Sequence, residues 1–295
     1  MNSVVNVRTC SWTSPKCDAM DPDFLVVGHV TKDVYPDGYR IGGTATYAAI
    51  TAARLGRRPA VLTRAAPDLP LSGALPQVEV LLLPSPVTTT FENVYSPQGR
   101  QQVIHAVADP LLCSDVPRDW RRMPIVLLGP LAQEIGPDMV GCFEGLIGVT
   151  PQGWMRQWDA SGRVSPQLWR GAAEVLPFVD ALVLSDEDLR GDLTPLQEYI
   201  RLCKIVVLTT GWQGATVFLE GERHEVPARA CHSEVDPTGA GDVFAAAFLI
   251  RLEETGDPLH ATRFANVVAS FSVERTGMEG IPSRAQVEAW LQVNT

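Results

Sequence analysis

Short apolar runs that alternate with helical patterns limit the fold of this chain more than any other feature of its sequence. The first run, residues 23–28 (DFLVVG), is typical of a buried strand, and residues 44–55 form a helical pattern that Gly56 ends at the usual cap position. Further apolar runs lie at residues 60–62, 78–83, 125–128, 146–149, 181–184 and 205–208. The C-terminal third adds helical patterns at residues 239–254, 258–275 and 284–292. This alternation predicts an α/β fold with a doubly wound, mainly parallel sheet that helices cover on both faces.

Length and composition predict a single elaborated domain over residues 21–295. The chain has 295 residues, of which 45% are hydrophobic, and this is enough to bury a full core. Residues 1–20 contain no apolar run long enough for a signal peptide, so we expect a loose leader and a cytoplasmic protein. No run reaches the roughly 18 apolar residues that a membrane helix needs.

Charge and cysteine content argue against several classes of function. Because 34 acidic residues stand against 24 basic ones, the formal net charge is −10, which disfavours binding to duplex nucleic acid or to an anionic membrane. Only three basic residues are lysines, so lysine-dependent chemistry has few places to act. The six cysteines form no CxxC pair and no zinc-type spacing, and we expect reduced thiols, most of them buried.

One segment departs from the alternation of strands and helices. Residues 87–107 (VTTTFENVYSPQGRQQVIHAV) alternate β-branched or aromatic residues with polar ones around a turn at residues 96–99. This pattern predicts an exposed β-hairpin. Within an α/β domain, such a hairpin is either an edge decoration or a flap over a site.

The string DPTGAGD, residues 236–242, is the motif most indicative of chemistry. Gly239 and Gly241 remove two side chains where a helix begins, which exposes backbone N–H groups at the positive end of the helix dipole. An anion can bind there, and Asp242 in the first turn can accept a proton from an attacking hydroxyl. The simpler alternative is a tight turn followed by an acid that favours the helix start. The string is not a dinucleotide fingerprint, because Phe244 replaces the third glycine, and no P-loop or protein-kinase motif occurs.

DPTGAGD fully matches the C-terminal motif D-[T/P]-x-G-A-G-D of the ribokinase-like sugar kinases, the PfkB family, which the sequence resembles from about Asp23 onward. The resemblance implies a small β lid on the α/β domain, ATP as donor, magnesium, and a hydroxyl of a sugar, polyol or nucleoside as acceptor. It implies Asp242 as the catalytic base, with the anion hole formed by Gly239, Ala240 and Gly241. Residues 87–107 resemble the lid strands, whose purpose is to exclude water from the donor. The family resemblance is compatible with either a monomer or a homodimer that pairs through the edges of the lid.

The resemblance also implies acceptor-binding residues near the N-terminus. Residues 28–33 (GHVTKD) resemble a segment whose Asp holds acceptor hydroxyls, here Asp33, although a solvated turn acid is the alternative. Gly42 and Gly43 match a glycine pair where the backbone comes close to the sugar, or an ordinary turn before a helix. Tyr47 replaces the Asn of ribokinase, so ribose becomes less favoured. Its ring offers either a flat wall for a different acceptor or part of the helix's core face.

Arg156 lies in residues 150–163 (TPQGWMRQWDASGR), a stretch similar to a family segment that often reads DPxxR. An arginine fork there suits either the donor phosphates or the acceptor. The spacing of Trp154 and Trp158 is alternatively explained by helical packing.

On the donor side, residues 207–215 (VLTTGWQGA) resemble the strand and turn beneath ATP. The nucleotide-binding candidates are therefore Thr209, Thr210, Gly211, Gly214, Thr238 and Asn266. For magnesium, Ser185 and Asp188 (SDED) take the places of the family's NxxE and keep oxygen ligands that would act through water. A plain helix cap at Ser185 or Asp186 is equally compatible with this string.

Together these features predict an ATP- and magnesium-dependent kinase that acts on a small sugar or polyol. The QGW…R segment, Tyr47 and SxxD resemble the inositol-kinase-like branch more than ribokinase itself. The alternatives are a nucleoside kinase of the same fold and a non-catalytic sugar or nucleotide sensor. A dehydrogenase lacks its dinucleotide fingerprint.

Overall fold

The main sheet of this computed structural model confirms the predicted fold class. Residues 21–96 and 99–294 are described, so the expected leader at residues 1–20 lies outside them. Nine strands run in the order β15-β14-β13-β12-β9-β8-β1-β4-β5, parallel except at β14 and β15, which pair antiparallel at one edge. They are β1 (Phe24–Val27), β4 (Pro59–Ala65), β5 (Glu79–Pro84), β8 (Ile125–Leu128), β9 (Leu146–Val149), β12 (Ala181–Ser185), β13 (Ile205–Thr209), β14 (Gly214–Leu219) and β15 (Glu222–Pro227).

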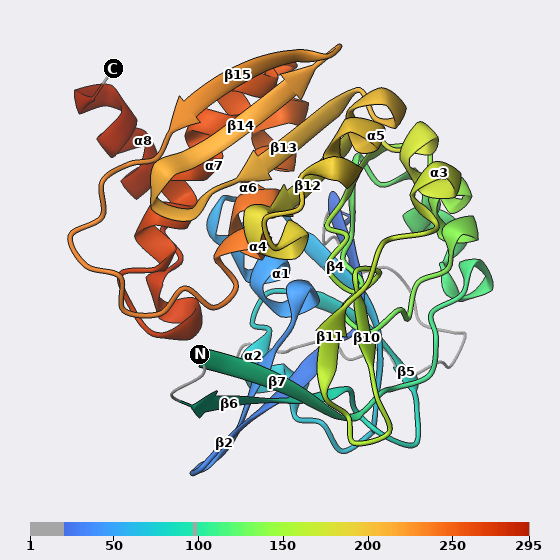
Figure 1. Cartoon of the computed structure of the whole chain (residues 1–295). Helices are drawn as coiled ribbons and strands as arrows, with labels where there is room; N and C mark the ends of the chain where they lie inside the picture. The colour runs from blue at the N-terminus through green and yellow to red at the C-terminus, as the bar shows by residue number, and fades with distance from the viewer. Residues whose placement is uncertain (1–20, 97–98, 295) are drawn as a thin grey trace.

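Helices cover both faces of this sheet (Figure 1). The α-helices are α1 (Thr44–Arg54), α2 (Leu71–Ala74), α3 (Ala172–Val175), α4 (Asp186–Leu189), α5 (Thr194–Leu202), α6 (Ala240–Thr255), α7 (Pro258–Ser272) and α8 (Arg284–Val293). Short 3-10 helices lie at Cys113–Asp115, Arg118–Arg122, Pro137–Cys142, Leu176–Phe178, Gly211–Gln213 and Gly277–Gly280. None of the described helices is long and apolar enough to span a membrane.

The alternation of side chains along β1 shows why the sheet is covered twice. Phe24 and Val26 enter the core beneath α1, α6 and α7, whereas Leu25 and Val27 enter the core on the α3 and α5 side. All four side chains are fully buried. A strand that is apolar at every position must therefore lie between two helix layers.

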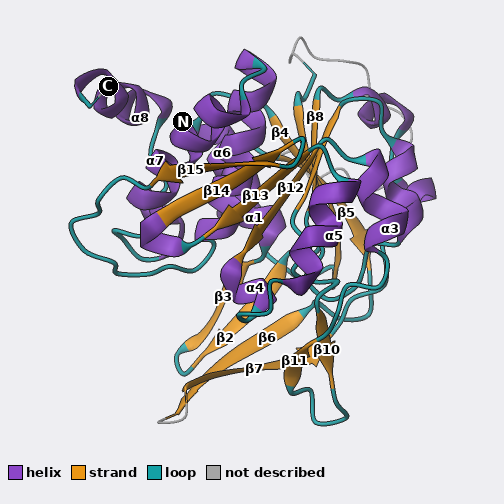
Figure 2. Ribbon diagram, turned by 45° about the horizontal axis from the view of Figure 1, so that its top comes forward, coloured by secondary structure: helices purple, strands orange, loops and turns teal. Residues whose placement is uncertain are grey.

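The predicted hairpin at residues 87–107 forms β6 (Thr90–Ser96) and β7 (Gly99–Ala106), and it belongs to a larger lid. This separate sheet has the order β3-β2-β6-β7, with β2 (Thr31–Tyr35) and β3 (Gly38–Gly42) contributed by the segment after β1. Figure 2 shows it projecting below the main sheet beside β10 (Arg156–Trp158) and β11 (Val164–Pro166). The sequence did not predict β2 and β3, because residues 31–42 carry few strongly apolar side chains.

Two sequence expectations require correction. Cys113 and Cys142 are joined by a disulfide, whereas Cys203 and Cys231 are free, so the expectation of six reduced thiols was wrong. The fold brings the two paired cysteines, 29 residues apart, to a Cα–Cα distance of 5.9 Å, which sequence spacing alone does not reveal. The helical explanation for Trp154 and Trp158 was also wrong: Trp158 ends strand β10, and Trp154 stacks on Trp169 at 4.8 Å between ring centroids.

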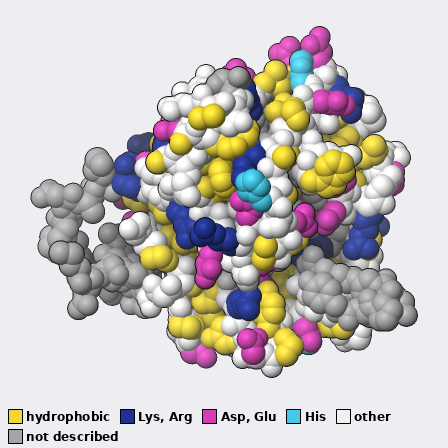
Figure 3. Space-filling view, turned by 90° about the vertical axis from the view of Figure 1, so that its left-hand side faces the viewer, with side chains coloured by type: hydrophobic (Ala, Val, Ile, Leu, Met, Phe, Trp, Pro, Cys, Tyr) yellow, Lys and Arg dark blue, Asp and Glu magenta, His cyan; other side chains and the backbone are white. Residues whose placement is uncertain are grey.

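Ion pairs join the C-terminal helices to the rest of the domain. Glu254 in α6 accepts from Arg284 at the start of α8 at 2.6 Å, from Arg251 at 3.1 Å and from Arg57 at 3.2 Å. On the face of the molecule shown in Figure 3, basic and acidic side chains are interspersed. The ion pairs fix α8 against the end of α6 and so support the helix that carries DPTGAGD.

Candidate active site

The strand order places a crevice between β1 and β8. From β1 the chain moves to β4 and β5 and then returns to β8 on the other side of β1, and ligands of such sheets bind at this reversal, beyond the carboxyl ends of the strands. Gly28 and Gly129 follow the two strands here. A Cβ on Gly28 would overlap the carbonyl oxygen of Gly129, and one on Gly129 would overlap Thr44. The two glycines therefore let α1 begin directly against the strand ends.

The DPTGAGD loop forms the start of α6, as the sequence predicts. Gly239 is the N-terminal cap and has a φ of 76°, a left-handed conformation that favours glycine. Asp236 fixes the loop, because its carboxylate accepts from Thr238 N–H at 3.0 Å and from Gly277 N–H at 2.8 Å. Thr238 is one of the predicted nucleotide-binding residues, and its backbone is held in this way.

The backbone N–H groups at this helix start are not all available to an anion. The Ala240 N–H donates to the carbonyl of Pro237 at 3.1 Å, and the Val243 N–H donates to the carbonyl of Gly239 at 2.9 Å. The N–H groups of Gly239 and Gly241 have no such backbone acceptor among the described residues. Of the predicted anion hole, the N–H groups of Gly239 and Gly241 are therefore available to an anion, whereas that of Ala240 is used by the turn.

Asp242 lies in the first turn of α6, where it receives a hydrogen bond from a distant residue. The Thr44 hydroxyl donates to Oδ1 of Asp242 at 2.7 Å, across a sequence separation of 198 residues. The residue is partly exposed, but the surrounding protein shields its carboxylate, and this burial raises the pKa of Asp242 to about 6. The Thr44 hydrogen bond and the positive charge of Arg156 lower this pKa, and the negative charges of Asp188 and Asp33 raise it. The electrostatic coupling shows that the fold brings these predicted residues together.

The hydrogen bond from Thr44 predicts a pH-dependent phenotype. Thr44→Val keeps the methyl group beside Gly129 but removes the donor, so the ionised form of Asp242 is stabilised less and its pKa rises. If Asp242 is the base, the acid limb of kcat/KM shifts to higher pH. We expect a loss of about ten-fold near pH 6, the worth of one charge-assisted hydrogen bond, and a smaller loss at pH 8.

Thr51→Val provides the matched control for this measurement. Thr51 is a buried threonine of the same helix, and its hydroxyl donates to the carbonyl of Tyr47 at 2.8 Å. Its pH profile should coincide with that of the wild type. Equal shifts in both variants would show that the effect comes from loosening α1.

The predicted acceptor residues Asp33, Gly42 and Gly43 lie together at the base of the lid. Thr31 donates to Oδ1 of Asp33 at 2.9 Å, and a Cβ on Gly42 would overlap the other carboxylate oxygen of Asp33. Gly43 has a φ of 88°, and a Cβ there would lie 2.8 Å from the carbonyl oxygen of His29. The glycine pair therefore allows the lid strands and α1 to meet tightly around Asp33.

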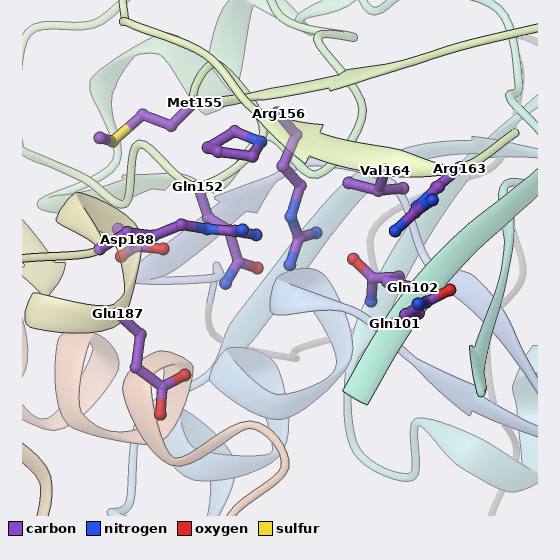
Figure 4. Close-up of a pocket in the computed structure, with 11 residues that line it drawn as sticks. Gln101, Gln102, Gln152, Met155, Arg156, Arg163, Val164, Glu187 and Asp188 are labelled. Carbon is purple, nitrogen blue, oxygen red and sulfur yellow. The ribbon is translucent and has the colours of Figure 1, made fainter. Parts of the chain in front are cut away.

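Tyr47 and Arg156 occupy different environments. Tyr47 is only 7% exposed, and its ring lies where a Cβ on Gly239 would stand, behind the start of α6. Burial raises the pKa of its phenol, with Asp236 and Asp33 adding to the effect. Arg156 instead stacks on Phe91 of the lid at 5.5 Å and reaches into a cavity of about 710 Å³ (Figure 4). The acceptor role given to Tyr47 stays a prediction, and its ring also supports Gly239.

Comparison with known proteins agrees with this geometry. The model of the pfkB family carbohydrate kinases matches residues 162–284. A cytidine kinase from Thermococcus kodakarensis is 27% identical over 77% of this chain and 87% of its own length, and an inositol 3-kinase from Arabidopsis thaliana is 28% identical over 67% and 58%. A pyrophosphate-dependent kinase in the ribokinase family, solved with a pyrophosphate analog and myo-inositol, superposes with a TM-score of 0.74 at 26% identity, covering 90% of this chain and 99% of that one.

Residues 162–284 of the chain match the pfkB family carbohydrate kinases, and the chain as a whole has the fold of the ribokinase-family kinase. As a relative of these kinases it is a phosphotransferase with a hydroxyl group as acceptor, which agrees with a shielded carboxylate at a helix start near a polar cavity.

A second, smaller cavity of about 130 Å³ adjoins the DPTGAGD loop. Four of the predicted nucleotide-binding residues line it: Thr209, Gly211, Gly214 and Asn266. The Asn266 amide donates to the carbonyls of Val226 and Pro227 at 2.9 and 3.2 Å, which leaves its side-chain oxygen for a ligand. Thr210 does not line this cavity, and its hydroxyl donates to the carbonyl of Gly214 at 3.2 Å.

Ser185 and Asp188 form a helix cap that still offers oxygen atoms toward the cavity. Oδ2 of Asp188 accepts from the Ser185 N–H at 2.9 Å, and the Ser185 hydroxyl accepts from the Asp188 N–H at 3.2 Å. The described residues contain no group of three His, Cys, Asp or Glu side chains that would hold a metal alone. Magnesium often relies on one or two carboxylates, water and the phosphates of the substrate, so a single carboxylate at this place fits the ion.

Two residues of this arrangement were missed by sequence reasoning. Glu134 is 2% exposed, and its carboxylate accepts from the N–H groups of His29, Leu131 and Ala132, which joins the loops after β1 and β8. Thr44 donates to Asp242. The sequence signal for Glu134 was an acid that ends the string PLAQE, and the signal for Thr44 was its place directly after the glycine pair. Both patterns are common in unrelated contexts.

Proposed function

We propose that this protein is an ATP- and magnesium-dependent kinase that phosphorylates a hydroxyl of a small polyhydroxylated acceptor. The observation that carries the proposal is the Asp242 carboxylate, which Thr44 holds at the start of α6 and which interacts electrostatically with Arg156 and Asp188 of the large cavity. Its pKa of about 6 makes it ionised at neutral pH, and it remains basic enough to accept a proton during transfer. The inositol- and cytidine-directed relatives support a cyclitol, a sugar or a nucleoside as the acceptor class.

The residues of this chain suggest how the transfer proceeds. Asp33 would orient the acceptor by accepting hydrogen bonds from its hydroxyls, and Asp242 would remove the proton from the attacking hydroxyl. The Gly241 N–H and the positive end of α6 would stabilise charge on the transferred phosphoryl group, as would the guanidinium of Arg156. Asp188 and Ser185 would hold magnesium through water, and the ion would supply further charge neutralisation on the donor phosphates.

The 130 Å³ cavity favours ATP over pyrophosphate as donor. Its lining includes Ala240, Gly241, Phe244 and Ala269. Because Ala240 and Gly241 begin α6, the cavity adjoins the helix start where the phosphates would lie. Pockets for drug-sized ligands measure about 300–1,000 Å³, so this one has room only for a part of a nucleotide such as the base. Pyrophosphate has no group that would occupy an apolar cavity here. The pyrophosphate-dependent relative nevertheless makes pyrophosphate the second candidate donor.

A donor assay tests this proposal. With Mg²⁺ and a panel of myo-inositol, ribose, cytidine and their monophosphates, we expect phosphorylated product with ATP and none with pyrophosphate. Ala269→Phe should fill the small cavity and raise KM for ATP by about ten-fold or more, since an overpacked site costs about 1–3 kcal/mol, while KM for the acceptor stays near the wild-type value.

Ala230→Phe is the control, because Ala230 is exposed and does not line this cavity. Product formation with pyrophosphate at the rate seen with ATP would reject the ATP assignment. No phosphorylated product with either donor and any acceptor would reject the kinase assignment as a whole.

A further inference from the structure

All four chain segments that join the lid to the main domain meet at His29. The chain passes from β1 to β2 through residues 28–30 and from β3 to α1 through Gly43. It passes from β5 to β6 through residues 85–89 and from β7 toward β8 through residues 107–124. His29 lies on the first of these segments, and its side chain is fully buried. Its contacts with the other three segments therefore bear on how the lid lies against the main domain.

The imidazole ring of His29 holds the two segments that flank the β6–β7 hairpin. Nδ1 lies 2.8 Å from the hydroxyl oxygen of Thr89, the residue before β6, and Nε2 lies 3.0 Å from the carbonyl oxygen of Asp109, which follows β7. A carbonyl oxygen only accepts, so these partners assign the hydrogen to Nε2. Because the Thr89 hydroxyl accepts from the Ala108 N–H at 3.0 Å, its own hydrogen is left for Nδ1 of the neutral ring. Both ring nitrogens thus hold the hairpin.

The backbone of His29 joins the same point to the main sheet and to α1. Its N–H donates to Oε1 of Glu134 at 3.0 Å, and this buried carboxylate also accepts from the N–H groups of Leu131 and Ala132, in the loop after β8. Oε1 of Glu134 also lies 4.0 Å from Nδ1 of the ring. The His29 carbonyl faces Gly43, where a Cβ would lie 2.8 Å from its oxygen. His29 is therefore fixed from the side of the main domain while its ring holds the lid.

The position of His29 bears directly on two carboxylates of the candidate site. Asp33 lies on β2, which begins two residues after His29. Thr44, the hydrogen-bond donor to Asp242, directly follows Gly43, which packs against the His29 carbonyl. A buried polar network of this kind has little freedom, because every group left without its partner costs free energy. We therefore expect His29 to set the place of the acceptor relative to the base.

We propose that His29 is a positioning residue that holds the lid in place over the acceptor, so that the phosphoryl group goes to the acceptor and not to water. This inference rests on the proposed kinase function. In the transfer, the acceptor oxygen bonds to the γ-phosphorus, the bond from phosphorus to the ADP oxygen breaks, and the hydroxyl proton goes to Asp242. In the side reaction, water supplies the attacking oxygen, and ADP, inorganic phosphate and a proton are released. A lid that is held less firmly admits water and favours this second route.

Thr89→Val tests this role with ATP and Mg²⁺. The substitution keeps the shape of the side chain but leaves Nδ1 of His29 and the Ala108 N–H without their partner in a buried place. The acceptor is whichever of myo-inositol, ribose, cytidine and their monophosphates the wild type phosphorylates fastest, and both phosphorylated product and inorganic phosphate are measured. We expect the ratio of product to inorganic phosphate to fall about ten-fold or more, and KM for the acceptor to rise by a similar factor, because fewer molecules hold the lid in place. KM for ATP should stay near the wild-type value.

Further variants separate a hydrogen-bond role from a loss of packing. Thr89→Ser keeps the hydroxyl without the methyl group and should restore most of the ratio. His29→Phe fills a similar space but loses both ring hydrogen bonds, so it should lower the ratio at least as far as Thr89→Val. Thr262→Val is the matched control: Thr262 is equally buried, and its hydroxyl donates to the Pro258 carbonyl at 2.8 Å within α7. A general loss of stability lowers the active fraction for both reactions and leaves their ratio unchanged.

Amide hydrogen exchange gives a readout that does not depend on turnover. In Thr89→Val, the amides of β6 and β7 should exchange about ten-fold faster than in the wild type, whereas those of β1 and β4 should keep their rates. An unchanged ratio of product to inorganic phosphate, or equally faster exchange in β1 and β4, would overturn the role of His29. If the wild type phosphorylated none of the acceptors, the kinase function would fall, and the exchange rates alone would decide whether His29 holds the lid.

Discussion

Replacing Asp242 by Asn is expected to lower kcat by about 10²–10⁴-fold, the usual contribution of a general base. KM should change little, because Asn keeps the size of the side chain and can still accept a hydrogen bond from Thr44. In the wild type, kcat/KM should fall as the pH decreases through about 6, since a protonated carboxyl cannot accept the proton of the attacking hydroxyl. The variant should lose this acid limb. Steady-state kinetics from pH 5 to 9 measures both effects.

The stability of the Asp242→Asn variant provides the control. The folded-state pKa of Asp242 is raised above its ordinary value of 3.8, so the unfolded state ionises more readily and the ionised carboxylate disfavours folding at neutral pH. Removing it should leave Tm equal to that of the wild type or higher. A variant that keeps near wild-type activity would remove Asp242 from the role of base, and a strongly lowered Tm would assign it a structural role.

Gly239→Ala should be the second most damaging substitution. The residue has a φ of 76°, which Ala adopts at a cost of about 1 kcal/mol, and its new Cβ would overlap the ring of Tyr47. Because Tyr47 is buried, relief requires the loop to move, and the Gly241 N–H moves with it. We expect a loss in kcat of about 10²–10³-fold, as for removal of one oxyanion donor, together with a loss of about 1–3 kcal/mol in the free energy of unfolding.

Gly256→Ala separates the two effects. Gly256 caps the other end of α6 with a φ of 67°, and a Cβ there meets no atom within 4 Å. This variant should lose stability through the left-handed backbone alone and keep its activity. If Gly239→Ala were no less active than Gly256→Ala, the position of the helix start would not matter for transfer.

The fold class and the start of α6 could be predicted because both follow from local physics. A continuous apolar run such as FLVV can satisfy its burial only between two helix layers, and α/β alternation follows from several such runs. The exposure of N–H groups at the start of α6 depends only on the backbone conformation of Gly239 and on the residues next to it in the chain. By contrast, β2 and β3 were missed, because the polar string TKDVY becomes a strand only by pairing with Phe91 and its neighbours.

The sequence by itself determined the α/β architecture, the family resemblance and the residues of the DPTGAGD loop, since each depends on neighbours in the chain. Only the tertiary structure decided that Thr44 binds Asp242, that Cys113 pairs with Cys142, and that Arg163 lies beside the lid strand β7. These contacts depend on strand order and on the reversal between β1 and β8. Thr44 and Asp242 are separated by 198 positions in the sequence, and the sequence carries no local signal of their proximity, because it arises from packing two helix starts against the same strand ends.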